Sequence, residues 1–188
     1  MKVRWLGNAA LEVFGDKHIL IDPNLTVEAS ETPDTVLLTH EHDDHFSPED
    51  YREIGKEAEL YAPALSLEKF ELEGTAVRPG DQIDDIEVLE SDCYGSEESV
   101  SYLYKGLLHA GDSAYFPDAE PVKAVFTACF PDYYDDYIEA FKRLGPDLVV
   151  PFHYDPEEDM EDAEGLKERL NEEGITNRIM RPGDHIDI

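Results

Sequence analysis

The sequence predicts a mixed α/β fold, and three observations support this prediction. Short apolar or alternating runs recur along the chain, separated by turn-forming residues, as is typical of strands. Residues 47–59 begin with the capping pattern of a helix, and residues 132–145 have the apolar spacing of a helix face. At 188 residues and 41% hydrophobic composition, the chain suffices for one well-packed core, so we expect a single domain spanning residues 1–188.

The first 40 residues are predicted to form strands. Four runs carry this prediction, at 3–6, 10–14, 18–23 and 35–40. A helix is then expected from Ser47, because serine is a favoured N-cap and Pro48 suits the first helical position. The segment between residues 40 and 46 therefore lies between a strand end and a helix start.

The rest of the chain continues the strand-rich pattern and adds two helices. Further strands are predicted at 59–63, 75–79, 86–91, 99–104, 106–111, 123–130 and 147–153, with Lys105–Gly106 as a hairpin turn. Helix 132–145 should bury one face and stop at Gly145–Pro146; that face holds Tyr134, Tyr137, Ile138, Phe141 and Leu144. A last helix at 157–174, with Ala163, Leu166 and Leu170 inward, precedes a closing pair of strands within 177–188.

One internal echo is visible in the sequence. The stretch VRPGDQIDDI at 77–86 resembles MRPGDHIDI at 180–188. Two similar half-domains would explain it, and so would independent use of the same Pro-Gly turn before a strand. The sequence leaves both explanations open.

The charge of the chain is extreme. Asp and Glu number 45 against 15 Lys and Arg, which gives a formal net charge of -30, and the acids are spread from end to end. Such a surface repels itself in dilute buffer and is tolerated where salt screens it. We therefore expect a cytoplasmic protein of a halophile. An acidic binding protein from an ordinary cell is the alternative. In either case the charge disfavours nucleic acid and anionic membranes as partners at low ionic strength, and molar salt weakens this argument.

Cysteine content and hydropathy place the chain in a reducing, aqueous setting. Two cysteines are too few for a disulfide scaffold. The first residues lack a continuous apolar segment, and no run approaches 18 apolar residues. We expect a soluble protein acting on a small-molecule substrate, in an oligomeric state that the sequence does not define.

The segment HEHDDH, residues 40–45, holds three of the seven histidines. His40 and His42 are two apart and point the same way in an extended chain, while Asp44 and His45 can face back toward them at the turn into the helix. Imidazole and carboxylate side chains that converge in this way suit divalent metal ions such as zinc or iron. A solvated acidic loop is the alternative, and three histidines among six residues argue against it.

The His-x-His-x-Asp-His string after a strand resembles the metallo-beta-lactamase superfamily. The segments 107–116 and 149–155 are similar to later elements of that family, and the opening segment 6–24 resembles the branch of small hydrolases that includes ascorbate-6-phosphate lactonase. The resemblance covers essentially the whole chain. It implies a four-layer αββα sandwich, with two mixed sheets flanked by helices and a binuclear metal site at one edge of the sheets.

The resemblance also implies a ligand set for two divalent metal ions, most simply Zn²⁺, with Mn²⁺ or Fe²⁺ as alternatives. His40 and His42 would bind the first ion. Asp44, His45 and His153 would bind the second, and Asp112 would bridge the two.

One family ligand has no counterpart in this chain. The family takes a third histidine for the first metal from a strand end before the bridging aspartate, and here that place holds ESDCYG, residues 90–95. Asp92, a hard oxygen ligand, is the preferred replacement. Cys93 as a soft thiolate, His109, or an incomplete first site are the alternatives.

Hydrolysis is the reaction that such a site implies. Two metal ions sharing a water generate hydroxide near neutral pH. Asp44 or Asp112 would orient it and relay its proton, with Asp44 as the expected catalytic residue, and His109 would stabilise the developing oxyanion. The expected activity is cleavage of a small ester, lactone or phosphodiester. The alternative is a metal-binding protein with an incomplete first metal site and no hydrolytic activity.

Asp22 follows a buried strand in the sequence LIDPN. Its carboxylate could orient a ligand histidine or cap the turn at Pro23, and the sequence favours neither.

Nuclease action, which occurs in other branches of the superfamily, would require a basic groove and an added nucleic-acid domain, and the sequence offers neither.

Overall fold

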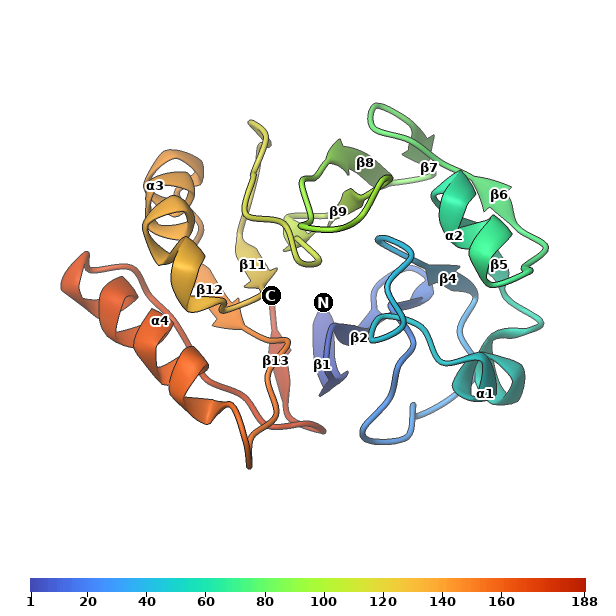
Figure 1. Ribbon diagram of the computed structural model, residues 1–188, viewed down its shortest axis with the longest axis horizontal. Helices are drawn as coiled ribbons and strands as arrows, with labels where there is room; N and C mark the ends of the chain where they lie inside the picture. Colours follow the sequence, from blue (N-terminus) through green and yellow to red (C-terminus); the bar gives the residue numbers. More distant parts are fainter. The chain divides into compact units, whose positions relative to one another are not determined.

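A computed structural model describes residues 1–188 and divides the chain into two compact units. The first unit contains residues 1–77, 96–99 and 181–188, and the second contains 78–95 and 100–180. Each unit is built on one mixed β-sheet with its own helices (Figure 1). The expected α/β class with two mixed sheets is therefore confirmed, while the single domain stays a prediction.

The sheet of the first unit has the strand order β13-β1-β2-β3-β4-β5-β6. The strands are β1 (Lys2–Gly7), β2 (Ala10–Phe14), β3 (His18–Ile21), β4 (Thr35–Leu37), β5 (Glu59–Ala62), β6 (Thr75–Ala76) and β13 (His185–Asp187). The strands from β13 to β3 pair antiparallel, and those from β3 to β6 pair parallel. The two ends of the chain meet here, because β13 pairs with β1 (Figure 1).

Two short helices accompany this sheet. α1 (Pro48–Asp50) begins where the sequence predicts, with the Ser47 hydroxyl accepting from the Asp50 amide at 3.2 Å, and the chain continues as a π-helix over Tyr51–Gly55. α2 (Ala64–Lys69) was not expected from the sequence. The core of the unit is a cluster that includes Leu6, Leu20, Val36, Leu38, Phe46 and Leu60.

The sheet of the second unit has the order β12-β11-β10-β9-β8-β7. Its strands are β7 (Gln82–Ile83), β8 (Ile86–Glu90), β9 (Val100–Tyr104), β10 (Leu107–His109), β11 (Ala124–Thr127) and β12 (Leu148–Pro151). β7 to β10 pair antiparallel, and β10, β11 and β12 are parallel. The β9–β10 hairpin turns at Lys105–Gly106 as predicted, with φ angles of 51° and 91° that suit a tight hairpin.

The second unit contains two helices, α3 (Tyr134–Leu144) and α4 (Met160–Glu172), which lie side by side (Figure 1). A 3₁₀ turn at Pro131–Tyr133 precedes α3. α3 buries Tyr137, Ile138 and Phe141 from the predicted face and ends at Gly145 in the left-handed conformation. α4 buries the three residues expected, Ala163, Leu166 and Leu170. Both helices are thus amphipathic elements that cover apolar surface.

The repeated Arg-Pro-Gly-Asp sequence forms the same turn twice. The carboxylate of Asp81 accepts from the Arg78 amide at 3.0 Å, and that of Asp184 accepts from the Arg181 amide at 2.9 Å. Each turn leads into an edge strand, β7 in the second unit and β13 in the first. The echo is therefore a repeated way of starting an edge strand.

The predicted closing strand pair is wrong in its first member. Only β13 forms a strand, and the upstream segment makes a single bridge between Asn177 and Val149. The reason is a contact distant in sequence, because the Met180 carbonyl accepts a hydrogen bond from the Tyr154 hydroxyl.

Candidate metal centre

The histidine loop of the first unit, residues 38–47, connects β4 to α1. Its beginning is held by the Leu38 amide, which donates to the Tyr61 carbonyl at 3.0 Å, and its end by the Ser47 amide, which donates to the Pro23 carbonyl at 2.9 Å. The Asn24 side chain also donates to the Asp43 carbonyl at 3.2 Å. Hydrogen bonds to neighbouring segments therefore fix the course of the loop before any ligand binds.

A buried carboxylate braces this loop from below. Asp22 is 1% exposed and accepts from the Thr39 amide at 2.7 Å and from the Thr39 hydroxyl at 2.6 Å. Its Oδ2 lies 2.8 Å from His45 Nδ1. Asp22 therefore orients a histidine of the loop, which decides between the two roles that the sequence left open.

These contacts define the tautomers of His40 and His45. The single hydrogen of the Thr39 hydroxyl goes to Asp22, because a carboxylate only accepts, so the 3.0 Å contact between Thr39 Oγ1 and His40 Nδ1 needs a hydrogen on His40. The His45 Nδ1–H donates to Asp22 for the same reason. In the neutral form of either ring the lone pair is then on Nε2, the nitrogen through which such an imidazole binds a metal ion.

The loop gathers its four predicted ligands. The ring centroids of His40 and His42 are 4.5 Å apart, and those of His40 and His45 are 4.0 Å apart. A ring nitrogen of His40 lies within 4.8 Å of one of His42, and a carboxylate oxygen of Asp44 lies within 4.8 Å of a ring nitrogen of His45. His40 and His45 are fully buried and Asp44 is exposed, so the set offers both fixed and adaptable donors.

Glu41, between the first two histidines, has a structural role. Its carboxylate accepts from the Ser96 hydroxyl at 2.7 Å and from the Glu97 amide at 3.0 Å, and its carbonyl accepts from Lys69 Nζ at 2.6 Å. Burial alone would raise the pKa of Glu41, but the Ser96 and Glu97 donors hold that pKa below its ordinary value. The residue between the first two histidines thus secures residues 96–97 to the first unit.

Asp112 and His153 come together in the second unit. Asp112 follows β10 and His153 follows β12, so both lie beyond the carboxyl ends of parallel strands. His153 Nε2 is 3.5 Å from Asp112 Oδ1, and the two side chains are 15% and 8% exposed. His153 adopts a φ of 60°, a conformation uncommon for a residue with a Cβ and one that functional sites often contain.

Cys93 and Asp92 belong to the segment where the family histidine is missing, and their side chains have different surroundings. Cys93 is 5% exposed, and its Sγ lies within 4.8 Å of an Asp112 carboxylate oxygen. Asp92 is exposed, and its amide donates to the buried Ser113 hydroxyl at 2.9 Å. The residue beside Asp112 is thus the cysteine, and the preference for Asp92 stays a sequence-based prediction.

His109 is fully buried at the end of β10. Its Nδ1 accepts from the Gly111 amide at 3.2 Å, which places the ring hydrogen on Nε2, and the ring packs edge-on against Phe152 at 5.1 Å. In this tautomer the ring nitrogens serve as an acceptor for the backbone and as a hydrogen-bond donor. His109 therefore suits the predicted role of a donor better than that of a ligand.

Cys129 is the second buried cysteine of this unit. Its thiol donates to the Phe152 carbonyl at 3.4 Å. Burial raises its pKa to about 12, and the carboxylates of Asp162, Asp159 and Asp112 add to that rise. It is therefore a protonated core residue.

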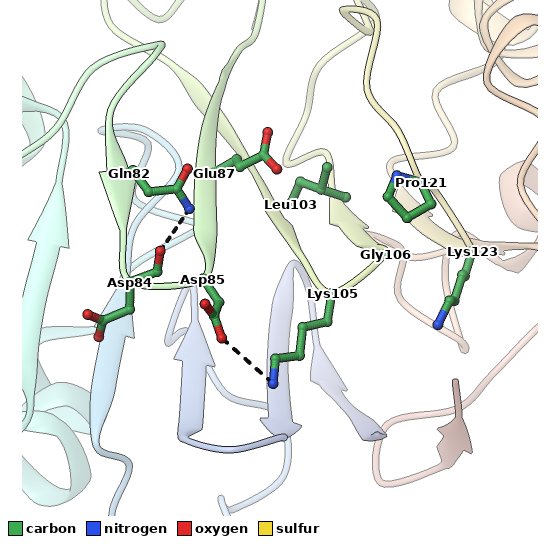
Figure 2. Close-up of a pocket in the computed structure, with 9 residues that line it drawn as sticks. All are labelled: Gln82, Asp84, Asp85, Glu87, Leu103, Lys105, Gly106, Pro121 and Lys123. Carbon is green, nitrogen blue, oxygen red and sulfur yellow. Dashed lines mark hydrogen bonds and ion pairs between the residues drawn. The ribbon is translucent and has the colours of Figure 1, made fainter.

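A pocket of about 380 Å³ lies at the other end of β10 from His109 (Figure 2). It surrounds the Lys105–Gly106 turn, and Lys105 Nζ lies 3.8 Å from Asp85 Oδ2. Its walls carry acids and lysines together, including Asp84, Glu87 and Lys123. The pocket and the predicted ligands of this unit are thus at opposite ends of one strand.

The comparisons with known proteins agree with this arrangement. The model of the beta-lactamase superfamily domain matches residues 2–153. The chain belongs to this superfamily. A UPF0173 metal-dependent hydrolase of Thermoplasma acidophilum is 33% identical over 193 aligned positions, covering 82% of this chain and 83% of that protein. A second, from Nanoarchaeum equitans, is 26% identical over the full length of both chains.

Solved structures of the superfamily share the fold. The metallo hydrolase Igni18 of Ignicoccus hospitalis superposes with a TM-score of 0.75 at 23% identity, covering 98% of this chain and 97% of that one. The metallo-beta-lactamase fold protein YhfI of Bacillus subtilis gives 0.76 at 16% identity, covering 99% of both. The recognised superfamily is confirmed, and the chain is a metal-dependent hydrolase of the metallo-beta-lactamase fold. The lactonase-like branch stays a prediction.

None of the helices is both long enough and apolar enough to span a membrane.

Proposed function

We propose that this hydrolase cleaves a small ester, lactone or phosphodiester with two divalent ions, most simply zinc. The tautomer-fixing network of Asp22 and Thr39 carries this proposal. It fixes Nδ1 of two buried histidines as a hydrogen-bond donor, so that each ring, once neutral, presents Nε2 as a metal ligand requires. A solvated acidic loop would need no such network.

Each unit supplies its own donor set. The first unit contributes His40, His42, Asp44 and His45, and the second contributes Asp112 and His153. The proposal is that these sets hold the two ions together, with His40 and His42 on one, Asp44, His45 and His153 on the other, and Asp112 between. Membership of the superfamily supports this assignment, and the imidazole and carboxylate donors suit zinc, manganese or iron.

The residues around the ions have distinct parts in the chemistry. Two bound ions would lower the pKa of a shared water to about 7 and polarise the substrate oxygen. Asp44, exposed at the mouth of the loop, orients the attacking water and accepts its proton. His109, with its hydrogen on Nε2, is a donor for the oxyanion that develops.

The setting of the enzyme follows from its charge. The net charge of -30 supports action in the cytoplasm of a high-salt cell, where salt screens the acidic surface. The proposed substrate is a small molecule, and no nucleic-acid or membrane partner is proposed. The opening segment 6–24 supports the branch of small lactone-cleaving hydrolases.

A hydrolysis screen in molar salt tests the proposal. The zinc-loaded protein is assayed on a chromogenic ester, a lactone and a phosphodiester, then again after chelation and after zinc is restored. We expect hydrolysis of at least one class, lost on chelation and recovered with the metal. A His42→Ala variant should lose that activity.

The metal-binding protein without hydrolytic activity remains the second candidate. The missing family histidine at residues 90–95 favours it. A protein that holds no more than one ion and hydrolyses none of the three classes would replace the first proposal with this one.

A further inference from the structure

We infer that Cys93 is a metal ligand, and that its thiolate takes the place of the histidine that the family uses in the first site. The inference rests on the proposed two-ion function and deepens it. A sulfur ligand makes one of the two positions softer, which favours zinc over manganese there.

The position of the sulfur supports this role. Cys93 Sγ and an Asp112 carboxylate oxygen lie within 4.8 Å of one another. Two such atoms on one tetrahedral zinc ion are about 3.6 Å apart, given bond lengths of about 2.3 Å to sulfur and 2.1 Å to oxygen. The two atoms are therefore close enough for one ion to bind both.

Hydrogen bonds around Ser113 determine whether Asp92 or Cys93 faces Asp112. The Ser113 hydroxyl accepts from the Asp92 amide at 2.9 Å and from the Tyr115 amide at 3.1 Å, and the Ala114 amide donates to the Asp92 carbonyl at 3.4 Å. These bonds hold the segment at Asp92 against the segment that follows Asp112. Successive side chains in an extended segment point to opposite sides, so Cys93 turns inward while Asp92 turns to solvent.

The two cysteines of the chain differ in what their surroundings allow. Both thiols donate to a backbone carbonyl, Cys129 to that of Phe152 at 3.4 Å and Cys93 to that of Tyr94 at 3.7 Å. Burial raises the pKa of Cys129 to about 12, with Asp162, Asp159 and Asp112 adding to the rise. Cys93 has a carboxylate beside it that can share a cation. A divalent ion there deprotonates the thiol and turns two adjacent acidic groups into a chelating pair.

Cobalt substitution tests the inference by a readout other than activity. The metal-free protein is loaded with Co²⁺ in molar salt, and the bound ions are counted while the near-ultraviolet spectrum is recorded. We expect an intense thiolate-to-cobalt charge-transfer band in the wild type. In the zinc-loaded protein, X-ray absorption should show one sulfur at about 2.3 Å beside the shorter nitrogen and oxygen shell.

Matched variants assign the band. Cys93→Ser should abolish it, Cys129→Ala and Asp92→Asn should keep it, and Cys93→His should bind as many ions as the wild type without the band. Circular dichroism of each variant checks that it is folded. Cys93→His, which restores the family's ligand, keeps the test valid if the serine variant does not fold.

The outcomes separate this inference from the proposed function. A wild type that binds two cobalt ions without a thiolate band overturns the cysteine ligand and leaves the two-ion hydrolase standing. The same holds if the band survives in Cys93→Ser, or if Asp92→Asn loses one ion while Cys93→Ser keeps both. A wild type that binds no cobalt overturns both.

Discussion

Two buried carboxylates of the first unit, Glu12 and Asp22, each bond to a histidine, and the two histidines have different parts. His18 donates from Nε2 to Glu12 at 3.1 Å and from Nδ1 to the Thr32 carbonyl at 3.2 Å, so both ring nitrogens carry hydrogen. His45 donates from Nδ1 to Asp22, which directs Nε2 away from that carboxylate. A histidine that donates from both nitrogens to fixed acceptors is a structural cation, whereas one whose Nδ1 donates to a buried carboxylate is oriented to bind a metal ion through Nε2.

The neighbours of the two carboxylates differ in the same way. Arg4 Nη1 lies 3.1 Å from Glu12, and the Ser30 amide and hydroxyl donate to it at 2.7 and 2.8 Å. Burial alone would raise the pKa of Glu12, but these donors and His18 lower it to about 2. Glu12 therefore acts as the counter-ion of a charged cluster, while Asp22 acts through the histidine loop.

Glu12→Gln should have the largest effect on stability. It leaves Arg4 and His18 without their carboxylate, and removing one partner of a buried ion pair costs about 3 kcal/mol or more. Urea unfolding in molar salt measures the loss, with the exposed Glu168→Gln as control. Metal content should not change, and a variant as stable as the control would contradict the structural role of Glu12.

The pH dependence of stability is the next largest effect. Because the pKa of Glu12 is lowered from 4.5 to about 2, its ionised carboxylate stabilises the folded protein fully above pH 4.5. This stabilisation, up to about 3 kcal/mol, is lost as the pH falls from 4.5 toward about 2. Burial alone would lower the pKa of His18. The hydrogen bonds to Glu12 and to the Thr32 carbonyl raise it, and the net result is a pKa above 6.5. That contribution is complete below pH 6.5 and is lost as the pH rises through the raised value.

Urea unfolding across this pH range separates the two groups. Glu12→Gln should flatten the acid side of the curve relative to wild type, and His18→Gln should flatten the neutral side. Parallel curves for wild type and both variants would mean that the cluster does not titrate as described.

Asp22→Asn should weaken metal binding by about 10–100-fold, as is typical when the carboxylate behind a ligand histidine is removed. The amide has one acceptor oxygen where the carboxylate has two, so its NH2 group must face either the Thr39 amide or the pair of donors from Thr39 and His45, and the orientation of His45 is disturbed. Metal titration of the chelated protein measures the change, with Asp136→Asn on the exposed face of α3 as control. Unchanged metal affinity together with a large loss of stability would mean that Asp22, like Glu12, has only a structural role.

Ser30→Ala should have the smallest effect, a loss of about 1 kcal/mol in the free energy of unfolding. The hydroxyl donates to Glu12 at 2.8 Å, but the Ser30 amide, His18 and Arg4 remain to hold the carboxylate. Urea unfolding against wild type measures it. A loss as large as that of Glu12→Gln would mean that the serine, not the ion pairs, secures the cluster.

The sequence predicts local features best. The strands of the first 40 residues, the Ser47 cap and the Lys105–Gly106 turn depend on near neighbours, and the structure confirms them. α2 carries no capping side chain and was missed. The second closing strand failed because a distant hydroxyl, that of Tyr154, bonds the Met180 carbonyl.

The same contrast applies to the candidate site. His40, His42, Asp44 and His45 were readable because they are contiguous. Cys93, Asp112 and His153 are separated along the chain and could be named only through the family resemblance. Asp22 gave a partial signal, since an acid directly after a buried strand is a candidate for orienting a ligand, but its partner could be found only in three dimensions.

The number of divalent ions per chain tests the central claim most directly. Elemental mass spectrometry of protein purified in molar salt measures it, with the Asp22→Asn and His42→Ala variants alongside. We predict about two ions in the wild type, fewer in His42→Ala, and an occupancy in Asp22→Asn that falls as free zinc is lowered. One ion or none in the wild type, even after dialysis against zinc and manganese, would contradict the two-ion hydrolase.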